Sequence, residues 1–168
     1  MKISVPALTV DIFIHTLGSL SAILDKGTAL AAQKKFDSSI LVTSRLAPDM
    51  LPLSKQVQIA CDTAKKGAAR LAGVDAPSFD DNEKTIEELR TRIARTIDYL
   101  KTLPASAFEG AEERDIKVPA GDRTLEFKGL SYLQRWILPN LFFHVTTAYN
   151  ILRHNGVEIG KRDYLGSV

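Results

Sequence analysis

One long, mostly apolar stretch, residues 131–156, limits how the chain can fold more than any other. It reads SYLQRWILPNLFFHVTTAYNILRHNG. One set of apolar residues recurs at three- and four-residue steps, as on one face of an α-helix: Leu133, Ile137, Leu141, Val145, Ala148 and Leu152. A neighbouring face carries a second set: Trp136, Asn140, His144, Thr147 and Ile151. A surface helix normally has a single apolar stripe, so this pattern predicts a central helix with partners on two sides.

The ends of this predicted helix are marked by local signals. Ser131 is available as an N-cap, and Gly156 is a typical C-terminal stop. Pro139 interrupts the pattern, so the helix either kinks at this proline or begins there.

Three more helices are predicted upstream. The first starts near Pro6 and carries a seam of large apolar residues, until residues 26–28 interrupt it and a short alanine-rich turn follows. A short turn near residues 37–41 precedes a second helix over about residues 48–72, which is stopped by Gly73. The buried stripe of the second helix is mostly small, which favours close helix packing: Leu53, Val57, Cys61, Ala64, Ala68 and Leu71. The third helix is expected to be capped by Asp81 or Asn82 and to end before Pro104.

A different pattern separates the third and fourth helices. Residues 114–129 alternate apolar and polar side chains around the turn sequence PAGD, which predicts a short β-hairpin over residues 115–118 and 124–128. Two short strands are only marginally stable alone, so the hairpin is expected to lie across the helices. The predicted fold is therefore all-α: a single domain, residues 1–168, forming a four-helix bundle with one added hairpin.

Composition excludes several classes of partner. The apolar and charged fractions, 45% and 25%, are those of an ordinary soluble protein. The net charge is +2 and the basic residues are scattered, so we expect no nucleic-acid partner. No run approaches the ~18 uninterrupted apolar residues of a membrane span, so we expect no membrane segment. The single cysteine, Cys61, rules out an internal disulfide and fits a cytoplasmic location.

Four phrases of the sequence resemble a known family. They are HVTTAYNILRHNGVEIGKRDYLG, RLAPDMLPLSKQVQIACD, the LPN before His144, and GAEERDIKV at the start of the hairpin. Together they look like an uncharacterised bacterial family, a domain of unknown function within the DinB/YfiT-like superfamily of predicted metalloenzymes. The resemblance runs over almost the whole chain, and it implies a four-helix bundle with a long crossover and a pocket at one end.

The resemblance also implies a metal site, from which this chain departs. Many superfamily members bind a divalent metal through one histidine of the second helix and an H-x-x-x-H pair of the fourth. His144 matches the last of these histidines, whereas Asn140 stands one turn earlier and the second helix offers only Gln58 or Cys61 nearby. Asn140 supplies only a weak amide oxygen to zinc or nickel, although Cys61 could supply a thiolate. We therefore expect no tight metal site, and His144, Asn140 and Cys61 are the candidate pocket residues.

Two functions remain open from the sequence. The first is a small-molecule-binding or self-associating bundle with a degenerate metal site, in which Cys61 packs in the core and His144 bonds Asn140 or a carbonyl. The second is a transferase or isomerase that depends on a thiol and on zinc or nickel, with a pocket around His144 between the second and fourth helices. The two apolar stripes of residues 131–156 also predict a homodimer. Whether the chain is an enzyme stays open at this point.

Overall fold

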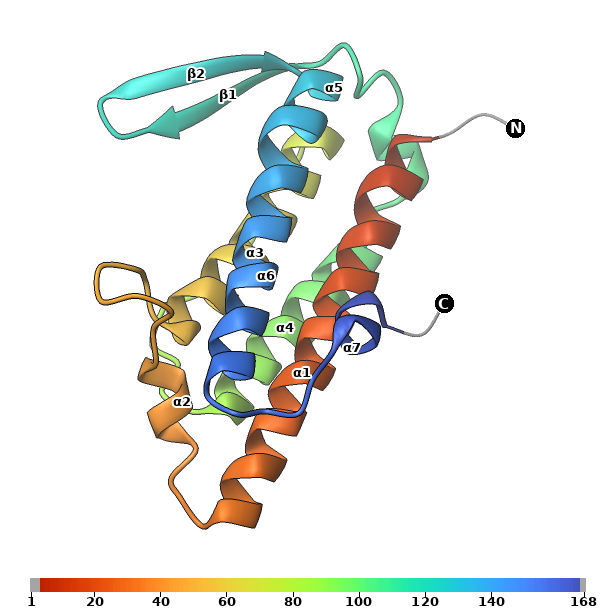
Figure 1. Ribbon diagram of the computed structural model, residues 1–168. Helices are drawn as coiled ribbons and strands as arrows, with labels where there is room; N and C mark the ends of the chain where they lie inside the picture. Colours follow the sequence, from red (N-terminus) through yellow and green to blue (C-terminus); the bar gives the residue numbers. More distant parts are fainter. Residues whose placement is uncertain (1–3, 167–168) are drawn as a thin grey trace.

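The computed structural model describes residues 4–166 of the chain. Four long helices lie side by side in this part and enclose the core (Figure 1). They are α1 (Ile12–Lys34), α3 (Leu53–Ala72), α4 (Ile86–Lys101) and α6 (Leu138–His154). Helix α3 packs against α4 and α6, and α1 packs against the same two helices from the other side. The protein is thus mostly helical, with one small antiparallel sheet.

Helix α1 is longer than the sequence pattern predicts. A short π-helical segment, η1 (Ala7–Asp11), follows Pro6 and continues directly into α1. The expected interruption at residues 26–28 is wrong, because α1 continues through Gly27 and ends only at Lys35, which has a left-handed φ of 56°. Gly27 is a place of close packing: a Cβ there would lie 3.3 Å from the Leu152 side chain of α6.

The segment Ala7–Lys34 is also the one described helix that is long and apolar enough to cross a membrane, with a mean hydropathy of 1.6 over its most apolar window. In this structure 44% of that window is buried inside the protein. A buried core helix passes the same test of length and composition. Its contacts with α4 and α6 are those of a core helix.

Helix α3 begins later than predicted. A short helix, α2 (Ser39–Thr43), and a series of turns occupy residues 39–50, and α3 starts at Leu53 after Pro52. Pro52 holds an extended backbone with ψ of 167°, which sets the boundary five residues after the expected start at Pro48. The expected stripe of small residues is buried, and Gly67 allows Ile137 of the last helix to approach so closely that a Cβ would meet it at 2.9 Å.

Helix α4 is capped by Thr85, and not by Asp81 or Asn82 as expected. The Thr85 side chain accepts from the Glu88 backbone N–H, and the Glu88 carboxylate accepts from the Thr85 N–H, which forms a complete capping box. Asp81 is instead engaged in ion pairs with Lys55 and Arg92. The connection over residues 74–85 is therefore tied to the helices on either side of it.

The predicted hairpin is present as β1 (Asp115–Ala120) and β2 (Arg123–Lys128), which follow a short 3-10 turn, η2 (Ala105–Phe108). The strands pair from Asp115 opposite Lys128 to Ala120 opposite Arg123, so Pro119 lies in a strand and not in the turn. The hairpin extends beyond the helices instead of lying across them (Figure 1). One face of the hairpin is anchored: Ile116 and Val118 are buried in the core, and the ring of Phe127 lies 5.6 Å from that of Tyr132.

The last long helix runs from α5 (Gly129–Tyr132) through a π-helical segment, η3 (Leu133–Ile137), into α6. It starts two residues before the expected cap, Ser131. The π-helical widening stands immediately before Pro139, which lies inside this continuous helix and has no N–H to donate to the preceding turn. A final short helix, α7 (Lys161–Leu165), packs back on α1, and an ion pair of 2.6 Å joins Lys26 to Asp163.

Candidate functional site

His144 lies on the side of α6 that faces α3, as the sequence predicts, but its partner there is Gln56. The His144 Nδ1 atom is 2.7 Å from Gln56 Oε1, and Gln56 Nε2 donates to the Leu51 carbonyl at 3.0 Å. Because the amide nitrogen of Gln56 is already donating, its oxygen is the acceptor, and Nδ1 of His144 carries the hydrogen. This bond leaves the lone pair on Nε2.

Burial governs the charge of His144. The side chain is half-buried, and the loss of solvation lowers its pKa below the usual value for histidine. His144 is therefore neutral at pH 7. A neutral imidazole with its lone pair on Nε2 can act as a base or a ligand.

The other two predicted site residues have separate roles. The Asn140 amide nitrogen donates to the Trp136 carbonyl one turn back at 2.7 Å. Cys61 is fully buried in the core, and burial raises the pKa of its thiol to about 12, although a hydrogen bond with Thr96 partly opposes this. Within residues 4–166, His144 bonds Gln56 and not Asn140, which differs from the expected pairing.

These residues do not fit the zinc or nickel site that the resemblance implies. Gln56 and Asn140 supply only amide oxygens, and Cys61 is a neutral thiol, so His144 is the one strong donor. Among the described residues there is no group of three His, Cys, Asp or Glu side chains that could hold a metal ion.

The lowered pKa of His144 predicts a pH-dependent stability. Because the unfolded chain binds a proton here more readily than the folded one, stability should fall as pH drops below about 6.5, the ordinary pKa of histidine. In the His144→Gln variant, the free energy of unfolding should depend less steeply on pH between pH 7.5 and 5. Urea unfolding at a series of pH values measures it, with the exposed His154→Gln as control. Equal slopes in His144→Gln and the wild type would contradict the assignment.

A polar hollow of about 280 Å³ lies on another part of α3. Four of its lining residues follow α3 at four-residue steps and so share one face of the helix: Gln58, Asp62, Lys66 and Arg70. The last long helix contributes Tyr132 and Trp136, also one turn apart. Asp81, from the connection before α4, completes this set. We call the four α3 residues the polar stripe.

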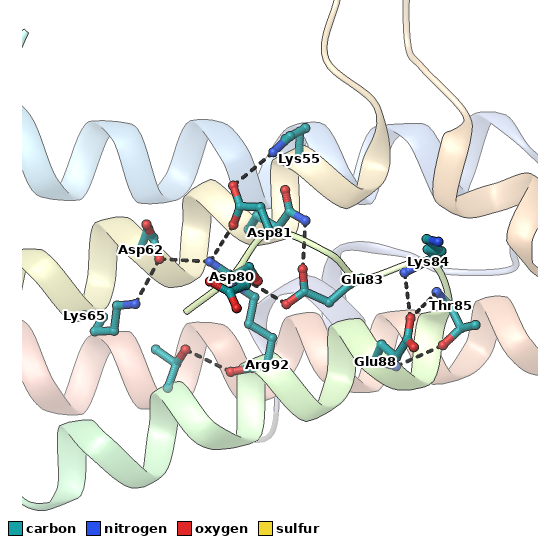
Figure 2. Close-up of polar contacts among 12 residues, drawn as sticks. Lys55, Asp62, Lys65, Asp80, Asp81, Glu83, Lys84, Thr85, Glu88 and Arg92 are labelled. Carbon is teal, nitrogen blue, oxygen red and sulfur yellow. Dashed lines mark hydrogen bonds and ion pairs between the residues drawn. The ribbon is translucent and has the colours of Figure 1, made fainter. Parts of the chain in front are cut away.

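A buried ion cluster supports one end of the hollow (Figure 2). Arg92 of α4 is only 1% exposed and forms ion pairs with Asp62 at 3.0 Å, Asp81 at 2.9 Å and Glu83 at 2.9 Å. Lys65, also buried, pairs with Asp62 at 3.1 Å. Figure 2 shows these carboxylates, from α3 and from the connection, pointing towards Arg92.

The cluster favours the charged forms of Asp62 and Arg92. Burial alone would raise the pKa of Asp62, but hydrogen bonds from Lys66 and Lys65 outweigh it and lower that pKa. Burial alone would lower the pKa of Arg92, but the hydrogen bond to Glu83 and the nearby carboxylates outweigh it and raise that pKa. Burial lowers the pKa of Lys65 despite its pairing with Asp62, and the Phe79 ring, with its centroid 3.7 Å from the Lys65 ammonium, offsets part of this cost.

Gln58 is left with an unused acceptor beside the hollow. The residue is only 3% exposed, and its amide nitrogen donates to Glu83 Oε2 at 2.8 Å. Its carbonyl oxygen, Oε1, is buried and has no hydrogen-bond partner among the described residues. A buried polar atom without a partner costs about 1–3 kcal/mol.

The opposite end of the hollow carries unused donors. Arg70 donates to the Tyr132 hydroxyl at 3.0 Å and forms no ion pair with any described residue. Tyr132 is buried, and burial raises the pKa of its hydroxyl while Arg70 partly opposes that shift. The hydroxyl accepts from Arg70 and keeps its own hydrogen to donate.

The polar stripe is a site that sequence reasoning missed. Charged residues at four-residue spacing normally mark the solvated face of a helix. The stripe of small residues beside them indicates helix–helix packing and not a binding site. One signal was present: Gln58, Asp62, Lys66 and Arg70 keep a strict four-residue spacing next to a face of close helix contact. The second wall, from Tyr132 and Trp136, became visible only with the tertiary structure.

Comparison with known proteins identifies the family. The family model described as a domain of unknown function, DUF1993, matches residues 7–165. A crystal structure of a DinB family member from Shewanella denitrificans is 48% identical, with a TM-score of 0.91 over 96% of this chain and 92% of that one. A search of curated proteins gives no significant match. The chain therefore belongs to the DUF1993 family and has a DinB-like fold, as the sequence resemblance predicts.

Proposed function

We propose that this protein is a non-catalytic four-helix bundle that binds a small molecule in the hollow beside the polar stripe. The observation that carries the proposal is the lining of the hollow, in which the polar side chains of the polar stripe stand opposite Tyr132 and Trp136. The Trp136 ring offers an apolar wall to the same guest.

The surroundings of the hollow favour a ligand-binding role of its polar residues over a purely structural one. Its lining carboxylates, Asp62 and Asp81, are fixed by buried cations, so their positions are set before any ligand arrives. Preorganised polar groups around a concave surface are typical of small-molecule sites. The amine of the lining, Lys66, is engaged in an ion pair with Asp62 at 2.7 Å, and we propose binding without catalysis.

The alternative, a metal- and thiol-dependent transferase or isomerase around His144, has one observation in its favour. Gln56 fixes the ring of His144 and leaves its Nε2 lone pair unused, as a base or ligand requires. The donors around it argue against tight metal binding. Metal analysis of protein purified without a histidine tag separates the two: we expect zinc and nickel far below one ion per chain, and a stoichiometric ion would favour the enzyme.

The hollow can be tested with the chain's single tryptophan, Trp136, as an internal reporter. We expect at least one of a panel of small amines, carboxylates, amides and sugars to change its emission saturably. Thr63→Leu fills the hollow without removing a charge, because Thr63 lines it from α3, and should abolish the response. Thr91→Leu, on the exposed face of α4, is the control. A panel without binders, or binders indifferent to Thr63→Leu, would overturn the proposal.

Self-association remains a separate proposal. Phe142 and Phe143 of α6 are 38% and 57% exposed, and large exposed aromatic side chains are common at interfaces. We expect a homodimer through this face, with a shift towards monomer in Phe143→Ser. Sedimentation equilibrium at micromolar concentrations measures it. The mass of one chain throughout that range would remove the proposal.

A further inference from the structure

Two contacts show how the last long helix runs beside α3 at the hollow. A Cβ on Gly67 would meet Ile137, and Arg70 donates to Tyr132. Residue numbers rise on α3 as they fall on the last helix, so the two helices are antiparallel. Trp136 lies one turn from Tyr132 and directly precedes Ile137, so it stands beside the stretch of α3 between Gly67 and Arg70. The hollow therefore brings an indole ring and a guanidinium close together.

The Arg70 guanidinium is held in place and still has donors left for a guest. A guanidinium has five N–H donors, and the hydroxyl of Tyr132, a residue only 1% exposed, takes one of them at 3.0 Å. Arg70 is half-buried, and none of its nitrogens is among the buried unpaired atoms of the described residues, so its other donors reach the surface. It lines the hollow and forms no ion pair with a described residue. Such a cation is suited to binding an anion.

The charges around the hollow also favour an anionic guest. The two lining carboxylates are already paired with cations: Asp62 with Lys65, Lys66 and Arg92, and Asp81 with Lys55 and Arg92. Arg70 adds a positive charge that no carboxylate of this cluster balances. Lys66 stands one turn before Arg70 on the same face of α3, so it strengthens the attraction for a negative charge at Arg70.

Trp136 gives this part of the hollow an aromatic wall. The residue is half-buried, and its ring lies 5.8 Å from the ring of Phe127, which in turn lies 5.6 Å from that of Tyr132. Phe127 comes from the hairpin, so the indole is supported from behind by a separate element. Aromatic rings pack favourably in offset-stacked or edge-to-face arrangements, so a flat aromatic guest suits this wall.

From these features we infer that the hollow takes a small aromatic carboxylate such as benzoate, with its carboxylate at Arg70 and its ring against Trp136. The inference rests on the proposed binding function and names its ligand class. The planar guanidinium matches the two oxygens of a carboxylate. A volume of about 280 Å³ is close to that of nine liquid waters at roughly 30 Å³ each, about as many as benzoate has heavy atoms. Both contacts lie within one helical turn, about 5.4 Å, so a guest of this size reaches both.

The test is a titration series at constant ionic strength, followed by the indole N–H cross-peak of Trp136, the single tryptophan. The probes are benzoate, benzyl alcohol without the charge, benzylamine with the opposite charge, and cyclohexanecarboxylate without the aromatic ring. We expect benzoate to bind at least tenfold more tightly than benzyl alcohol or benzylamine, and about two- to tenfold more tightly than cyclohexanecarboxylate. Arg70→Met should weaken benzoate about tenfold to a hundredfold and leave benzyl alcohol unchanged. Arg90→Met, whose exposed partner is Asp25, is the control and should change neither.

Each other outcome has a definite meaning. Benzyl alcohol or benzylamine binding as tightly as benzoate, or benzoate binding that Arg70→Met leaves intact, would overturn the inferred anion site. Cyclohexanecarboxylate binding as tightly as benzoate would overturn the aromatic ligand class. If all four probes fail while another small molecule binds and is blocked by Thr63→Leu, the inference is wrong and the hollow remains a binding site. Failure of every small molecule in both experiments would overturn the proposed function as well.

Discussion

Replacing Arg92 by methionine is expected to lower the free energy of unfolding by about 3–5 kcal/mol, because it leaves several carboxylates without their shared cation. Glu83 and Asp62 are the most enclosed of these, and the backbone carbonyl of Asp80 loses its donor at 2.9 Å. Methionine fills much of the same space, so the loss reports on charge and not on volume. Urea unfolding followed by circular dichroism measures it.

A matched control lies on the same helix. Arg90 forms an exposed ion pair with Asp25 at 2.7 Å, and exposed pairs contribute less than about 1 kcal/mol. Arg90→Met should therefore leave the midpoint of unfolding almost unchanged. Similar losses in the two variants would mean that the ion cluster around Arg92 is not the buried support described above.

Gly129→Ala is expected to cost about 3 kcal/mol or more, at the upper end of the range for overpacking. A Cβ at this position would overlap the carbonyl oxygen of Ala111, a backbone atom that cannot turn aside as a side chain can. Relieving this overlap would move the start of α5 away from the backbone of Ala111 and Glu112. In the wild type, the Leu130 N–H donates to the Glu112 carbonyl at 3.0 Å. Because Tyr132 follows in the next turn, binding in the hollow should weaken as well.

Gly18→Ala provides the comparison for this glycine. No atom lies within 4 Å of a Cβ on Gly18, which occupies an exposed position of α1. Alanine there should raise stability by about 0.5–1 kcal/mol through its better helix propensity. Thermal unfolding of the two variants gives opposite shifts if the packing is as described, and an unaffected Gly129→Ala would contradict it.

Sequence patterns predicted the helices well because their signals are local. The four-residue recurrence of Leu133, Ile137 and Leu141 requires only one buried face, and the structure buries all three. Helix ends were harder, because they depend on tertiary contacts. Gly27 resembles a break in the sequence, yet α1 continues through it because the Leu152 side chain occupies the space that a side chain would need.

The candidate site was harder to predict than the fold. His144 was found from its spacing, but its partner Gln56 lies 88 residues away, and no local pattern joins the two. Cys61 offered a plausible ligand in the sequence, whereas its burial and a pKa of about 12 make it a core residue. The hollow needs α3, the 74–85 connection and the last helix together, so it emerges only from the tertiary arrangement.

The central claim is that a small molecule binds beside the polar stripe and that no metal site lies at His144. A single ¹H–¹⁵N spectrum tests it, because the chain has one indole N–H, that of Trp136. We predict that at least one small molecule of the panel moves this cross-peak saturably in the wild type and not in Thr63→Leu, while one equivalent of Zn²⁺ leaves the spectrum unchanged. A Trp136 peak that no small molecule moves, together with stoichiometric Zn²⁺ shifts around His144, would contradict the claim.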